Sequence, residues 1–115
     1  MTDQITRLFE STEDFIYRFK DHLPSYGEQL RVFEEETTEL ENAVWDYIQG
    51  KDTKSHIAKE FADVAVTAIG LCMQADLVSE DLISGINFVI DELNNKTLDT
   101  HYLNEKTGKI TKRGK

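Results

Sequence analysis

The sequence predicts an all-α protein, an antiparallel four-helix bundle, and three observations point to it. Apolar residues recur every three or four positions over most of residues 1–96, the period of a helix with one buried side. One proline and six glycines leave few interruptions in 115 residues. Short connections between the segments favour antiparallel neighbours. With 39% hydrophobic and 30% charged residues, each helix has one wide stripe to bury, and such stripes also suit pairing with a second copy.

The single proline separates the first two predicted helices. We expect the first helix over Gln4–Leu23, with its apolar residues on one side. The second begins after Pro24, with Ser25 near its start, and ends at Gly50, a residue suited to a helix C-terminus. The predicted buried positions are Ile5, Leu8, Phe9, Phe15, Ile16 and Phe19 in the first helix and Leu30, Phe33, Leu40, Val44, Tyr47 and Ile48 in the second.

Capping residues mark the starts of the other two helices. The third helix starts at Thr53 and runs to about Asp76, and the fourth opens with Ser79 and two acids that suit a helix N-terminus. Residues 1–96 form the predicted helical domain, and 97–115 form a polar, basic C-terminal tail. We expect a loose tail, with closure over an anionic substrate as the alternative. The predicted buried positions are Ile57, Phe61, Val64, Ala68, Leu71 and Cys72 in the third helix and Ile83, Ile86, Val89, Ile90 and Leu93 in the fourth.

Charge and composition restrict the function. The formal net charge of −9 argues against nucleic acid as a partner, because binding its backbone normally needs a basic face. The single cysteine, Cys72, cannot form an internal disulfide, and the N-terminus lacks the pattern of a secretory signal, so we expect a cytoplasmic protein. The longest apolar segment, Val64–Met73, is too short to span a membrane, and no membrane partner is expected.

The second and third predicted helices carry matching pairs of acids. Glu36 and Glu39 lie three residues apart on one helix, and Glu60 and Asp63 lie three apart on the other. We place both helices on helical wheels, with about 100° of rotation per residue. In each pair, the first acid lies about 60° and the second acid about 120° from the middle of the buried side of its helix. Neighbouring helices can bring these four carboxylates together at the edge of the core. They would repel one another there unless a cation such as Mg²⁺ joins them.

The simpler alternative is a solvated acidic face, since glutamate is a good helix former. We assign Glu34 and Glu41, which lie off the shared border, to such a face. His56, one turn before Glu60, is expected to be an exposed residue, with a supporting role for that acid as the alternative. For the whole chain, the alternative function is a non-catalytic acidic helical interaction module, such as a phage or regulatory protein that docks a basic partner.

The pattern Glu35-Glu36-x-x-Glu39, twenty residues, then Glu60-x-x-Asp63 resembles the EExxE…ExxD signature of the MazG-like NTP pyrophosphohydrolases. This superfamily includes dimeric dUTPases and phosphoribosyl-ATP pyrophosphohydrolases, and the resemblance covers roughly Leu30 to Lys96. It implies an all-α bundle completed by oligomerisation, as a homodimer or homotetramer. It also implies hydrolysis of a (deoxy)nucleoside triphosphate to the monophosphate and pyrophosphate, with Mg²⁺ as cofactor and Mn²⁺ as a substitute.

The same resemblance implies roles for individual residues. The metal ligands would be Glu36, Glu39, Glu60 and Asp63. Glu35 would be a further ligand or would orient the water, and we choose it as the catalytic proton acceptor. A metal-activated water would cleave the anhydride without a side-chain nucleophile. Asn94 and Lys96 are the candidate substrate-binding residues, with the alternative that they only end the fourth helix.

Overall fold

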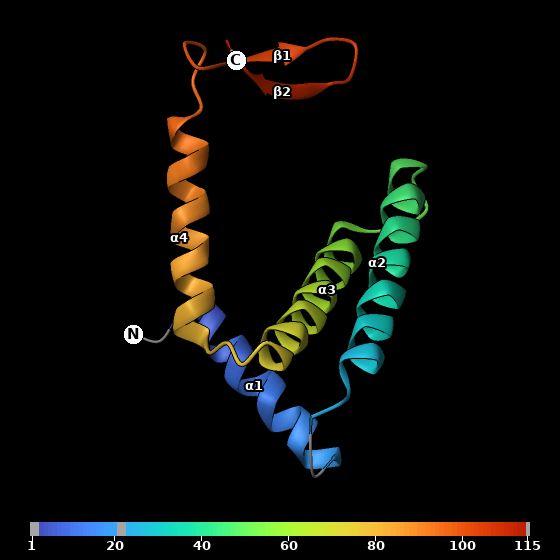
Figure 1. Ribbon diagram of the computed structural model, residues 1–115. Coiled ribbons are helices and arrows are strands. Elements are labelled where there is room, and N and C mark those ends of the chain that lie inside the picture. The colour runs from blue at the N-terminus through green and yellow to red at the C-terminus, as the bar shows by residue number, and fades with distance from the viewer. Residues whose placement is uncertain (1–2, 21–22, 115) are drawn as a thin grey trace. The chain divides into compact units, whose positions relative to one another are not determined.

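The computed structural model describes residues 3–20 and 23–114, which contain four helices and two short strands (Figure 1). The helices are α1 (Gln4–Phe19), α2 (Tyr26–Ile48), α3 (Lys54–Gln74) and α4 (Ser79–Asn95), and the strands are β1 (His101–Asn104) and β2 (Lys109–Lys112). The chain divides into two units, Met1–Glu80 and Asp81–Lys115. No helix in the described residues is by itself long and apolar enough to cross a membrane. The helices α3 and α4 reach that length and apolarity only as a bent pair. The predicted all-α class with four helices is confirmed.

Local hydrogen bonds fix the starts of α2 and α3 where the sequence predicts them. The Ser25 hydroxyl accepts the Glu28 N–H at 3.2 Å, and the Glu28 carboxylate accepts the Ser25 N–H at 2.9 Å, a reciprocal capping box. The Thr53 hydroxyl accepts the N–H of His56 at 3.2 Å. Beyond the other end of α2, Gly50 takes the left-handed conformation, with φ +79°, that glycine adopts without strain.

The first helix is shorter than predicted. It ends at Phe19 instead of Leu23, and Lys20 already has an extended backbone with φ −136° and ψ 145°. The N–H of Lys20 still donates to the Ile16 carbonyl at 2.9 Å and so closes the last turn. Pro24 disfavours the helical conformation in the residue before it, Leu23. Residues 21 and 22 of the predicted helix lie outside the described residues.

In the first unit, α2 and α3 pack against each other and α1 packs against α3. The buried side chains of this core are Phe9, Ala43, Ile69 and Met73. Gln29 is also buried, and its amide donates to the Thr67 carbonyl at 3.1 Å across the α2–α3 seam. A side chain at Gly70 would overlap this amide, so the glycine allows the two helices to approach closely.

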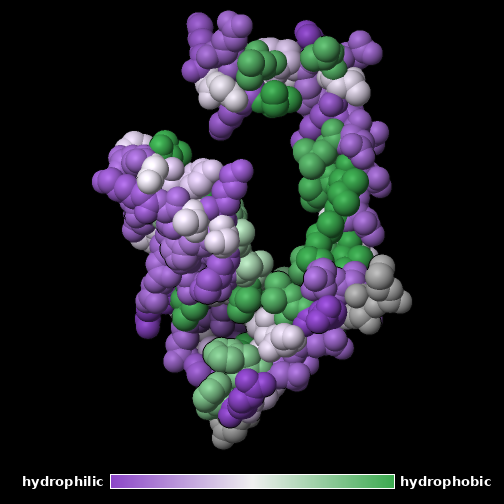
Figure 2. Space-filling view, turned by 180° about the vertical axis from the view of Figure 1, so that it is seen from behind, coloured by the Kyte–Doolittle hydropathy of each residue, from purple (hydrophilic) through white to green (hydrophobic). Residues whose placement is uncertain are grey.

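Several residues predicted to be buried are exposed. Phe61 is 57% exposed and Phe19 is 72% exposed, because the packed helices cover only part of each apolar stripe. Others in the same class are Phe15, Ile48, Val89, Ile90 and Leu93. Figure 2 shows hydrophobic residues gathered along α4.

The second unit joins α4 to a β-hairpin, so the expectation of a loose tail was wrong. β1 and β2 pair antiparallel, with Leu103 opposite Ile110. The Asn104 side chain accepts the N–H of Lys106 at 3.0 Å, which turns the chain, and Gly108 completes the turn with φ +73°. Turn residues therefore give this polar, basic segment regular structure.

Candidate metal centre

Three of the predicted acids meet at the seam between α2 and α3. Glu36 of α2 and Glu60 and Asp63 of α3 each offer one carboxylate oxygen, and these three atoms lie within 4.8 Å of one another. Helical spacing explains the convergence. Glu36 follows the buried Gln29 by seven residues, or two turns, and Asp63 precedes the buried Thr67 by four, so each acid shares the face that its helix turns to the other.

The cluster buries oxygen atoms that have no partner. The Glu60 side chain is 12% exposed and the Asp63 side chain is 32% exposed. Oε2 of Glu36 and Oε2 of Glu60 are buried and make no hydrogen bond to any residue in 3–20 or 23–114. An unpaired polar atom in this position costs stability unless something satisfies it. Convergent carboxylate oxygens are the ligands that a hard divalent cation such as Mg²⁺ prefers, so the residues present fit a metal ion.

The charge state of Glu36 reflects this crowding. Burial raises the pKa of the Glu36 carboxyl above its ordinary value of 4.5. A hydrogen bond to Glu39 and the negative charges of Glu39, Asp63 and Glu60 raise the pKa further. The metal-free cluster therefore makes Glu36 easier to protonate than an isolated glutamate, and a cation would favour the ionised form.

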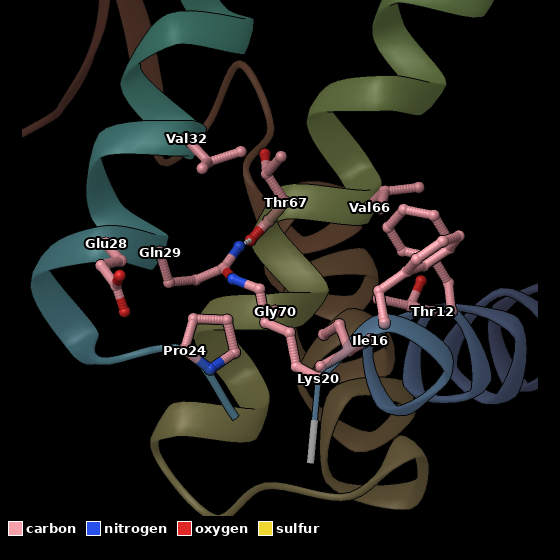
Figure 3. Close-up of a pocket in the computed structure, with 12 residues that line it drawn as sticks. Thr12, Ile16, Lys20, Pro24, Glu28, Gln29, Val32, Val66, Thr67 and Gly70 are labelled. Carbon is pink, nitrogen blue, oxygen red and sulfur yellow. Dashed lines mark hydrogen bonds between the residues drawn. The ribbon is translucent and has the colours of Figure 1, made fainter. Parts of the chain in front are cut away.

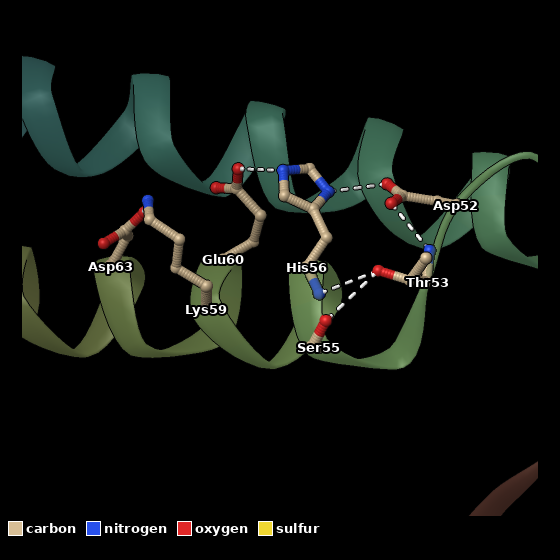
Figure 4. A network of polar contacts seen from close by, with 7 residues as sticks. All are labelled: Asp52, Thr53, Ser55, His56, Lys59, Glu60 and Asp63. Carbon is tan, nitrogen blue, oxygen red and sulfur yellow. Dashed lines mark hydrogen bonds and ion pairs between the residues drawn. The ribbon is translucent and has the colours of Figure 1, made fainter.

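A histidine links Glu60 to a further carboxylate (Figure 4). His56 Nε2 lies 3.3 Å from Glu60 Oε1, and His56 Nδ1 lies 2.7 Å from Asp52 Oδ2. The other Asp52 oxygen accepts the Thr53 N–H at 2.7 Å. The hydrogen bond and charge of Asp52 raise the pKa of His56 above 6.5, and the charge of Glu60 adds to this effect. His56 is exposed in the first turn of α3, as expected, and its contact with Glu60 also fits the supporting role that was the alternative.

Sequence reasoning missed Lys59. Its Nζ lies 2.7 Å from Asp63 Oδ2, an ion pair between positions four apart on α3. The hydrogen bond and charge of Asp63 raise the pKa of the lysine, as do the charges of Glu60 and Glu36. The signal that could have found this residue is the i, i+4 spacing of a basic and an acidic residue on one helix.

The structure leaves Glu35 and Glu39 outside the group of three. Both are exposed and line an open depression on α2 together with Arg31, Glu34 and Thr38. Glu39 follows Glu36 by three residues and interacts with it, so it lies at the rim of the cluster. Glu35 precedes Glu36 in the sequence, but its side chain is turned by about 100° around the helix axis from that of Glu36.

The two substrate-binding candidates belong to the second unit. Asn94 is exposed in the last turn of α4. The Lys96 N–H donates to the Leu93 carbonyl at 3.4 Å and so takes part in ending the helix. Lys96 also lines a cavity of about 510 Å³ with Tyr102 and Ile110 of the hairpin.

A second cavity lies in the first unit, where α1, α2 and α3 meet (Figure 3). Its volume is about 250 Å³, and most of its lining is apolar. Val32, four residues before Glu36, and Thr67, four residues after Asp63, both line it. The cavity therefore opens about one helical turn, or about 6 Å along the axis, from the acids. Its other lining residues include Thr12, Phe15, Phe19, Gln29 and Val66.

Compared by sequence, the chain matches no family model and no curated protein. Compared by structure, it is similar to the crystal structure of the Bacillus-conserved MazG protein, a nucleotide pyrophosphohydrolase. The TM-score is 0.65 at 21% identity, and the match covers 86% of this chain and 98% of the other. The fold class implied by the acidic signature is confirmed: this chain has the all-α fold of a MazG protein.

Proposed function

We propose that this protein is a Mg²⁺-dependent pyrophosphohydrolase that converts a (deoxy)nucleoside triphosphate to the monophosphate and pyrophosphate. One observation carries the proposal: Glu36, Glu60 and Asp63 converge and bury two carboxylate oxygens that no group within the described residues satisfies. The fold agrees with it, because the similar Bacillus protein is a nucleotide pyrophosphohydrolase. The net charge of −9 agrees as well, since an acidic protein needs a cation to bind an anionic nucleotide.

The chain's own residues would divide the work. Glu36, Glu60 and Asp63 would hold the metal, with Glu39 at the rim as a further ligand and Mn²⁺ able to replace Mg²⁺. When bound, the metal supplies charge neutralisation for the phosphates and lowers the pKa of a water. In the reaction the water oxygen bonds to the α-phosphorus, the α–β anhydride bond breaks and pyrophosphate leaves. Glu35, which solvent reaches, is our proposed acceptor of the water's proton.

The cavity between α1, α2 and α3 is our proposed site for the nucleoside. It opens about one turn from the acids along both helices that carry them, so a triphosphate on the metal would direct the sugar and base toward it. Phe15 and Phe19 offer aromatic surface for a base, and the buried Gln29 amide offers polar atoms to read its edge. Asn94 and Lys96 remain proposed contacts to the base and phosphates.

We also propose a homo-oligomer, a dimer or tetramer. Phe88 is 65% exposed and Leu93 is 62% exposed, and both belong to the apolar surface of α4. Contiguous exposed apolar residues on a water-soluble helix mark an association surface. Light scattering coupled to size-exclusion chromatography measures the mass, and a monomer at micromolar concentration would contradict this part of the proposal.

Pyrophosphate release from a panel of nucleoside triphosphates, with Mg²⁺ and then Mn²⁺, tests the function. We expect Asp63→Asn to lower turnover by about 100-fold or more, since it removes a ligand, and Glu39→Gln to lower it less. Glu41→Gln is the matched control, an exposed glutamate of α2 that we assign to the solvated face. Full turnover in the Asp63 variant, or release of orthophosphate in place of pyrophosphate, would contradict the proposal.

A further inference from the structure

We propose that Lys59 is a resident counter-ion of the metal centre, which is displaced from Asp63 when the metal binds and then binds the phosphates of the substrate. The proposal rests on the proposed function, because it assumes that the carboxylate cluster takes a divalent cation. It adds a substrate-binding residue that lies outside the acidic signature.

The position of Lys59 supports the first half of this role. Its Nζ bonds one oxygen of Asp63 at 2.7 Å, which is one of the three acids that would hold the metal. Figure 4 shows Lys59 extending along α3 to reach that carboxylate. The charges of Glu60 and Glu36 also act on its ammonium group. In the metal-free protein, Lys59 therefore supplies positive charge beside one of the acids that would hold the cation.

A comparison with His56 shows which of the two basic groups can move. His56 is held from both sides, with one ring nitrogen at Glu60 and the other at Asp52. Lys59 pairs with Asp63, and its side chain is 68% exposed on a flexible four-carbon stem. His56 is thus built to keep Glu60 in place, whereas Lys59 can leave Asp63 at little cost.

Charge decides where Lys59 goes. A divalent cation among Glu36, Glu60 and Asp63 repels the ammonium group and competes with it for the Asp63 oxygen. A triphosphate bound to that cation places anionic oxygens on the solvent side of the cluster, and lysine is a common point-charge ligand for phosphate. Lys59 therefore opposes metal binding by itself and favours metal binding together with phosphate, which couples the two ligands.

The experiment compares the natural protein with Lys59→Met, which keeps most of the length of the side chain and removes its charge. Lys54→Met is the matched control, an exposed lysine in the first turn of the same helix. Isothermal titration with Mn²⁺ alone gives the affinity of the metal. A second titration with pyrophosphate at saturating Mn²⁺ gives the affinity of the phosphate groups without turnover.

We expect two changes of opposite sign. Lys59→Met binds Mn²⁺ alone about two- to fivefold more tightly, the scale of an exposed ion pair, and binds pyrophosphate about tenfold more weakly. Lys54→Met matches the natural protein in both titrations. Unchanged or weaker Mn²⁺ binding in Lys59→Met, or unchanged pyrophosphate binding, overturns the inference. Failure of the natural protein to bind Mn²⁺ overturns the proposed function as well, so the two failures are distinguishable.

Discussion

Replacing Glu36 with glutamine is expected to stabilise the metal-free protein while it removes the metal site. Glu36 is a partly buried carboxyl whose pKa is raised by burial and by the acids around it. Glutamine has the same shape, carries no charge, and offers an N–H that can donate to a neighbouring carboxylate. A substitution that improves stability and abolishes function is the expected behaviour of a residue kept for its ligand role.

The distances set the magnitude. Two unit charges 4.8 Å apart repel by about 1 kcal/mol in water and about 3.5 kcal/mol at an effective dielectric constant of about 20. Glu36 faces Glu60 and Asp63 at or below this separation. His56 and Lys59 neutralise part of the charge on those two acids, and solvent reaches the rim. We therefore expect a net gain of about 1 kcal/mol, which raises the melting temperature by about 4 °C or more.

Thermal melts with and without Mg²⁺ measure both effects. The natural protein should gain about 2.7 kcal/mol when the metal is at about 100 times its Kd, whereas Glu36→Gln should gain almost nothing. Glu34→Gln is the control, an exposed glutamate two positions away on α2. A metal-free Glu36→Gln protein that melts below the natural one, or that keeps the full metal-dependent shift, would refute this reasoning.

Three further predictions concern pH, packing and a helix start. The pKa values of His56 and Glu36 are both raised in the folded protein, so it binds more protons than the unfolded chain and loses stability as pH rises. His56 contributes its full stabilisation of the folded state below its ordinary pKa of 6.5 and loses it as the pH rises. The destabilisation from ionised Glu36 is absent below 4.5 and appears as the pH rises. The melting temperature of the metal-free protein should therefore fall from about pH 5 to pH 8. A melting temperature that does not change between about pH 5 and pH 8 would contradict the raised pKa values of these two residues. Gly70→Ala should displace the Gln29 amide and cost about 1–3 kcal/mol in urea unfolding, and a loss below about 0.3 kcal/mol would show that the seam is looser than described. Ser25→Ala removes one half of the capping box and should cost about 1 kcal/mol by the same measurement, with no change in metal affinity.

The starts of α2 and α3 were predictable because their signals are local. Ser25 and Glu28 form a capping box within four residues. Thr53 caps α3 by accepting a hydrogen bond from the N–H of the residue three positions later. The hairpin had a local signal too. Asn104 and Gly108 are turn formers at a suitable spacing, whereas helical periodicity, which ends before them, carries no information about a hairpin.

Burial was less predictable, because it depends on which helices meet. The wheel places Glu39 and Asp63 at the same angle from their buried arcs, yet Glu39 is exposed and Asp63 is partly covered. The difference arises from α3, which packs against both α1 and α2, so its border is covered over a wider arc. The exposure of Phe61 has the same kind of cause, since apolar spacing alone does not say how far a neighbouring helix reaches.

The most direct test of the account is where a divalent ion binds. Crystals grown or soaked with Mn²⁺ would show the ion by its anomalous scattering. The account predicts one or more peaks at the α2–α3 seam, with carboxylate oxygens of Glu36, Glu60 and Asp63 at about 2.0–2.3 Å from manganese. An ordered structure at saturating Mn²⁺ with no peak among these three carboxylates, or with their side chains turned apart, would contradict it.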